Sequence, residues 1–160
     1  MVFAVAHNSG DAIPTTLEAV GAVAGIIEID VASLDRKESS GAFVALLLQF
    51  LDRHRGGRPI MVVSSDRDVI PVLAERGAET LRFLGIADEP SLVRPQGDDQ
   101  LAGLIDGVSI RHTLLNEERA AWLEDRRRLT LAWTINDLKR LNELVELGVD
   151  AVTTDNLAIM

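Results

Sequence analysis

The sequence contains no cysteine, so it can form neither a disulfide framework nor a thiolate metal site. This absence fits a reducing compartment, and we expect a cytoplasmic protein. Long apolar runs are also missing, and none approaches the roughly 18 residues that span a membrane. The apolar run at the N-terminus is short and lacks the basic flank of a signal peptide.

Positive charge is scarce as well. The chain has 16 lysine and arginine residues against 25 aspartate and glutamate residues, which gives a net charge of −9. An acidic chain without a basic stripe is not expected to bind nucleic acid or an anionic membrane surface. A small anionic ligand is not excluded, because one bound cation can reverse the local field.

Several well-known signatures are absent. The sequence has no Gly-x-Gly-x-x-Gly run, no Walker loop, no nucleophile elbow and no zinc-ligand spacing. It does have 160 residues, of which 47% are hydrophobic, and that is enough to build a core without covalent cross-links. We therefore expect one globular domain over residues 1–160.

Short apolar runs alternate with longer amphipathic segments along the whole chain. Strands are predicted at residues 2–6, 26–31, 60–63, 81–84, 108–110, 129–133 and 151–153. Helices are predicted to begin near Thr15, Gly41, Val69, Glu117 and Leu138, and a loop is predicted over 90–100. Continuous apolar runs favour parallel strands covered by helices. The pattern predicts an α/β fold, a reduced or incomplete (β/α) TIM-type barrel of about seven parallel strands, since a full barrel takes about 250 residues.

Polar residues at the carboxyl ends of these strands are the candidates for chemistry. Glu28 and Asp30 alternate along one strand and therefore share a face. Two neighbouring carboxylates are costly to bury unless a hard cation such as Mg²⁺ or Ca²⁺ joins them. The alternative is a solvated strand end in which these acids form ordinary salt bridges. His7 ends the first strand, where an imidazole beside a metal site could act as a general acid or base.

Several segments of the sequence together resemble the glycerophosphodiester phosphodiesterase family. They are Ala6-His7 with the helix start at 14–19, the run Ile27-Glu28-Ile29-Asp30-Val31, and the closing stretches 132–136 and 147–155, with further similarity at 60–66. The resemblance implies a TIM-type barrel with metal-dependent cleavage of phosphodiesters. It also implies that His7 is catalytic, that Glu28 and Asp30 hold the metal, and that Trp133 lines the site.

The sequence departs from that family at several positions. Asn8 stands where the family has an arginine, and the asparagine of the first helix start is absent. The second catalytic histidine has no counterpart after Asp30, and a strand that carries a third acidic ligand is missing. His112 and Arg111 follow a later strand and could replace the lost histidine and bind phosphate, respectively. The alternative is that both are ordinary loop residues.

Two functions therefore remain open. The first is a metal-dependent phosphodiester hydrolase with His7 and His112 as catalytic residues and Asn8, Arg111 and Trp133 as substrate-binding residues. The second is a catalytically degenerate relative that binds a phosphorylated ligand or serves as an interaction module. The expected partner is a small phosphodiester substrate or a phosphorylated ligand. A shortened barrel also predicts a homodimer, because a lost strand or helix leaves an edge or an apolar face to cover.

Overall fold

A computed structural model describes the chain at residues 2–4, 27–31, 44–45, 48–49, 52–53, 60–76, 80–90 and 99–159. The predicted helix that begins near Thr15 lies outside these residues, as do His7 and Asn8. Of the helix predicted after Gly41, the structure describes residues 44–45, 48–49 and 52–53, and all of them are helical.

Strands and helices alternate along the described chain. The strands are β1 (Val2–Ala4), β2 (Ile27–Val31), β3 (Ile60–Ser64), β4 (Thr80–Ile86), β5 (Gly107–Arg111), β6 (Leu129–Trp133) and β7 (Ala151–Thr154). The helices are α3 (Val69–Arg76), α5 (Asp99–Leu104), α6 (Glu117–Asp125) and α7 (Leu138–Glu146), with short 3₁₀ turns η1 (His112–Leu114) and η2 (Leu157–Ile159).

The described strands form one sheet in the order β1-β7-β6-β5-β4-β3-β2, and each neighbouring pair is parallel. Neighbours in space are neighbours in sequence, except that β1 pairs with β7. This is the strand order of a (β/α) barrel, in which the first strand returns to the last. The structure thus confirms the α/β class and a sheet of the partial-barrel type. The strand number of the whole chain stays a prediction.

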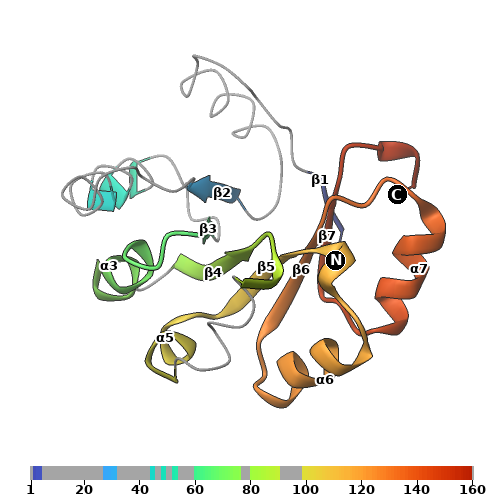
Figure 1. The fold of residues 1–160 in the computed structure, drawn as a ribbon. Coiled ribbons are helices and arrows are strands. Elements are labelled where there is room, and N and C mark those ends of the chain that lie inside the picture. The colour runs from blue at the N-terminus through green and yellow to red at the C-terminus, as the bar shows by residue number, and fades with distance from the viewer. Residues whose placement is uncertain are drawn as a thin grey trace.

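Helices cover one face of the sheet and form an arc around the strands (Figure 1). The strand residues on this outer face, such as Leu84 and Ile110, pack with helix residues such as Leu123 and Leu144. Ile60 and Val62 pack in the same way against α3. On the opposite, inner face, Met61, Val63, Phe83 and Leu131 pack with one another and with no helix residue among those described. Both faces are apolar, as the sequence predicts.

The first residue of β5, Gly107, lies where a side chain would not fit. A Cβ atom at this position would lie 2.4 Å from the backbone oxygen of Leu129 and 2.6 Å from the Phe83 ring. Phe83, Gly107 and Leu129 are register partners across three strands. The Phe83 ring therefore occupies the inner-face space that a side chain at residue 107 would need.

Local signals set the helix boundaries near the C-terminus. The Asn116 side chain accepts a hydrogen bond from the Arg119 N–H at 3.0 Å and caps α6. Asp137 caps α7 by accepting from the Lys139 N–H at 2.9 Å. Gly148 ends α7 with a φ of 77°, which a side chain would disfavour. These boundaries agree with the sequence-based prediction.

The loop predicted over residues 90–100 is too long at its carboxyl end. The structure begins α5 at Asp99, within the predicted loop. The six-residue helix carries only Leu101 as a buried hydrophobic residue, so its apolar periodicity is too brief to detect in the sequence. Residues 91–98 lie outside the described part.

Among the described residues, no helix is both long enough and apolar enough to cross a membrane.

Candidate functional site at the carboxyl ends of the strands

The inner face of the sheet changes character along the strands. The part further from the carboxyl ends of the strands is the apolar cluster that includes Phe83 and Leu131. Two residues further along their strands lie Gly85 on β4 and Trp133 on β6, and Ser109 is the register partner of both Gly85 and Leu131. Between the apolar cluster and the carboxyl ends of the strands, β4 and β5 thus carry the small residues Gly85 and Ser109 on this face.

Arg111 and Trp133 form a pair at this end of the sheet. They are register partners and the last residues of β5 and β6. The guanidinium carbon of Arg111 lies 5.5 Å from the centre of the Trp133 ring, within the range of a cation–π contact. Arg111 is exposed and Trp133 is partly buried. The stacked guanidinium is therefore held in place while its polar edge stays accessible to an anion.

The strand register places Glu28 and Asp30 on the same face of the sheet as this pair. Glu28 is aligned with Met61 and Asp30 with Val63, and both partners belong to the inner-face cluster. The flanking residues Ile27 and Ile29 align instead with outer-face residues of β3. The two acids thus occupy inner-face register positions in β2, as their spacing predicts. Their side chains lie outside the described part of the structure.

Two carboxylates at alternating positions suit a hard divalent cation by donor chemistry. Among the side chains that the structure describes, no group of three or more histidine or acidic residues could hold a metal ion. The sequence-predicted pair therefore remains the candidate, and a metal there would need further ligands beyond Glu28 and Asp30.

His112 contacts a helix. Its Nδ1 accepts a hydrogen bond from Nε of Arg140 on α7 at 3.3 Å. Burial lowers the pKa of His112, and the nearby charges of Arg140 and Arg111 lower it further. The imidazole is thus favoured in its neutral form, with the proton on Nε2. Arg111 and His112 are adjacent in sequence but have different partners, Trp133 and Arg140.

Asn136 organises the two loops beside Trp133. Its Oδ1 accepts hydrogen bonds from the Thr154 hydroxyl at 3.1 Å and from the Asp155 N–H at 3.0 Å. Thr154 Oγ1 also accepts from the Asn156 N–H at 2.9 Å. The loops that follow β6 and β7 are therefore held together next to the Arg111–Trp133 pair. The sequence did not predict this role of Asn136.

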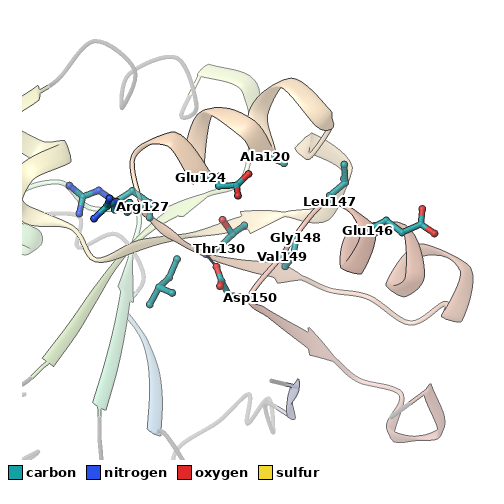
Figure 2. A pocket seen from close by; sticks show the side chains of 11 residues that line it. Ala120, Glu124, Arg127, Thr130, Glu146, Leu147, Gly148, Val149 and Asp150 are labelled. Carbon is teal, nitrogen blue, oxygen red and sulfur yellow. Dashed lines mark hydrogen bonds between the residues drawn. The ribbon is translucent and has the colours of Figure 1, made fainter.

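A separate cavity of about 570 Å³ lies at the other end of the strands, between the last turns of α6 and α7 (Figure 2). Polar groups around it hold the strand starts. Asp150 Oδ2 accepts from the Thr130 N–H at 2.8 Å, and Arg128 donates to the Ile105 oxygen at 2.8 Å. No residue that the sequence predicts for the site lines this cavity, so it is distinct from the candidate site.

No family model and no curated protein matches the sequence. Solved structures do match. A phosphodiesterase from Oleispira antarctica, solved with the product sn-glycerol-3-phosphate, superposes with a TM-score of 0.63 at 18% identity. A glycerophosphodiester phosphodiesterase from Parabacteroides distasonis gives a TM-score of 0.63 at 19% identity. The matches cover 79% and 80% of this chain.

The chain shares its fold with these phosphodiesterases over the part that the matches cover. It spans about half the length of these two neighbours, with 50% and 52% of their chains covered. The resemblance found in the sequence is thus confirmed for the fold, in a shortened form.

A third structural neighbour is close to this chain in length, unlike the two phosphodiesterases. The glycerol uptake operon antiterminator regulatory protein of Listeria monocytogenes has a TM-score of 0.56 and 14% identity. The match covers 98% of this chain and 92% of that chain. The fold of this chain is therefore also shared by a protein of similar size that is named as a regulator.

Proposed function

We propose that the chain is a metal-dependent phosphodiester hydrolase whose site lies at the carboxyl ends of the strands. The observation that supports it most is the pairing of Arg111 with Trp133 on the sheet face whose register positions include Glu28 and Asp30. A phosphate-binding cation and a pair of metal-binding acids would then share the inner face. The fold and its phosphodiesterase neighbours favour the same end of the sheet.

Each residue has a proposed role. Arg111 would bind two phosphate oxygens through its planar fork, and Trp133 would hold that fork by stacking. Glu28 and Asp30 would hold Mg²⁺ or Ca²⁺, which when bound supplies Lewis-acid stabilisation of phosphoryl charge. His7 would move a proton at the reacting oxygen, and Asn8 would contact substrate. For His112, the bond from Arg140 to Nδ1 leaves Nε2 as the atom that could face a substrate.

A metal titration tests the first part of this proposal. Mg²⁺ or Ca²⁺ should raise the melting temperature of the wild type in a concentration-dependent way, because only the folded chain would bind it. Glu28→Gln keeps the size of the side chain and should remove most of this rise. Glu124→Gln, which changes an exposed carboxylate on α6, is the control and should leave the rise unchanged. An equal rise in the wild type and in Glu28→Gln would contradict the assigned metal pair.

Turnover tests the second part. Glycerophosphodiesters and bis(p-nitrophenyl) phosphate should be hydrolysed in the presence of the cation. We expect His7→Ala to lose about 10²–10⁴-fold in rate, the usual contribution of a general acid or base. Arg111→Met should weaken substrate binding, and full activity of both variants would overturn the assignment.

A degenerate, ligand-binding protein is the second candidate. It is favoured by the missing second histidine and by the neighbour of similar length that is named as a regulatory protein. In that case the chain would bind a cation and a phosphorylated small molecule at the same residues without turnover. Binding of sn-glycerol-3-phosphate that requires Arg111, with no hydrolysis across a broad phosphodiester panel, would select this function.

A further inference from the structure

The guanidinium of Arg140 on α7 donates hydrogen bonds to the segment that follows Arg111. Its Nη2 donates to the His112 oxygen at 2.5 Å and to the Leu115 oxygen at 3.2 Å. Its Nε donates to His112 Nδ1 at 3.3 Å, while Nη1 bonds Glu143 on the same helix at 2.9 Å. One side chain therefore ties the first residue of η1 and the residue that follows η1 to α7, and with them the carboxyl end of β5.

The surroundings of Arg140 favour a fixed geometry. Its side chain is only 21% exposed, and the Glu143 carboxylate holds it from the next helical turn. Arg119 on α6 also binds this segment, by donating to the Leu114 oxygen. Arg119 is in turn paired with Glu89, at 2.6 Å. The carbonyl groups of η1 are thus bound by arginines from two helices.

We propose that Arg140 is the positioning residue that sets the direction of Arg111 over Trp133, and so the affinity of the site for phosphate oxygens. This inference rests on the proposed function. Arg111 is the residue immediately before the anchored segment, so any shift of His112 moves the backbone that carries its guanidinium. A planar fork can bind several acceptors at fixed angles, whereas an ammonium cannot.

The inference predicts that the geometry of Arg140 matters more than its charge. Dimethyl phosphate is a suitable probe, because it is a monoanion across the neutral pH range. Its binding can be followed through the indole N–H resonance of Trp133 in NMR spectra, assigned with a Trp122→Phe variant. Arg140→Met should weaken binding about tenfold, the usual cost of losing a group that orients a binding residue.

Arg140→Lys separates positioning from charge attraction. If Arg140 acts as a positioning residue, the Arg140→Lys variant should bind dimethyl phosphate as weakly as the Arg140→Met variant. The backbone amides of residues 113–115 should also exchange faster with solvent in both variants than in the wild type. Arg126→Met is the matched control, because Arg126 is the arginine at the C-cap of α6 and stacks on Trp122 at 4.3 Å, away from the site. It should leave both readouts at wild-type values.

Two outcomes overturn the inference. Wild-type affinity in Arg140→Met contradicts it directly, and wild-type affinity in Arg140→Lys shows that only the positive charge mattered. A wild type whose Trp133 resonance does not respond to dimethyl phosphate contradicts the proposed function, which distinguishes that failure from the failure of Arg140 alone.

Discussion

Arg82 and Asp106 join β4 to the start of β5 through an ion pair with two side-chain hydrogen bonds. Arg82 donates from Nε at 2.9 Å and from Nη2 at 3.1 Å to the two carboxylate oxygens, and its backbone N–H donates at 2.8 Å. Burial alone would raise the pKa of Asp106. The side-chain and backbone hydrogen bonds from Arg82, with the charges of Arg82 and Arg128, lower that pKa below its usual value.

We predict that Asp106→Asn lowers the free energy of unfolding by about 1–2 kcal/mol at pH 7, because an amide can accept fewer of these bonds. The Asp106 contribution is present above the usual pKa of aspartate and is lost as the pH falls through the lowered value. The difference between wild type and variant should therefore shrink below about pH 4. Urea unfolding at several pH values measures this, with Asp125→Asn as an exposed control.

His112 shows the same direction of proton linkage as Asp106, in a higher pH range. Its pKa is lowered by burial and by the charges of Arg140 and Arg111, so the unfolded chain binds a proton more readily than the folded chain. Stability from this residue is complete above the usual histidine pKa and is lost as the pH falls through the lowered pKa.

We therefore predict that the wild type loses stability below about pH 6.5 and that His112→Gln loses less of it. A glutamine keeps an acceptor for Arg140 but does not titrate. Urea unfolding at pH 8 and pH 5.5 measures the effect. The same pH dependence in both proteins would show that His112 does not contribute.

At the scale of elements, the end of α7 depends on backbone conformation. The Gly148 N–H bonds the Val145 oxygen at 3.0 Å and the Val149 N–H bonds the Leu144 oxygen at 3.1 Å, which closes the last turn. The φ of 77° at Gly148 lets the chain turn directly into β7. A Cβ atom there would have no neighbour within 4 Å, so the cost of a side chain would come only from the backbone.

Gly148→Ala should lower the free energy of unfolding by about 1 kcal/mol, the cost of a left-handed conformation for a residue with a side chain. Gly103→Ala is the matched control. Gly103 lies in α5, and a Cβ atom there would have no neighbour within 4 Å. Gly103→Ala should therefore raise the free energy of unfolding by up to about 1 kcal/mol. Thermal unfolding of the two variants should shift the melting temperature in opposite directions, and shifts in the same direction would contradict this account.

For the whole molecule, the order of the sheet is the main feature. Within the described residues, β1 and β2 stand at the two ends of the sheet although they are the first two strands in sequence. The parallel order around the sheet otherwise follows the chain. The described strands thus form a barrel-type sheet, while the matches cover 50% and 52% of the two phosphodiesterases.

The dimer expected from the shortened fold belongs to this scale. We predict a symmetric dimer, since pairing with a second copy would cover an edge or an apolar face of a reduced barrel. Light scattering after size exclusion, over a micromolar concentration range, measures the mass. A constant monomer mass across that range would contradict the prediction.

Parts of the candidate site could be predicted because they depend on alternation along one strand. The spacing of Glu28 and Asp30 indicated a shared face, and the register of β2 with β3 agrees. Arg111 and Trp133 could be placed at strand ends, but their contact depends on the pairing of β5 with β6. Arg140 could not be found at all, since nothing in a helix sequence shows which loop an arginine will reach.

The sequence by itself determined the α/β alternation, the apolar character of both sheet faces and the ends of the later helices. These follow from local propensity, capping groups and hydrophobic periodicity, which act within a few residues. Only the tertiary structure decided which strand ends lie together, that Arg111 stacks on Trp133, and that His112 is bound by Arg140. Those contacts join residues more than 20 positions apart, and long-range packing alone brings them within reach.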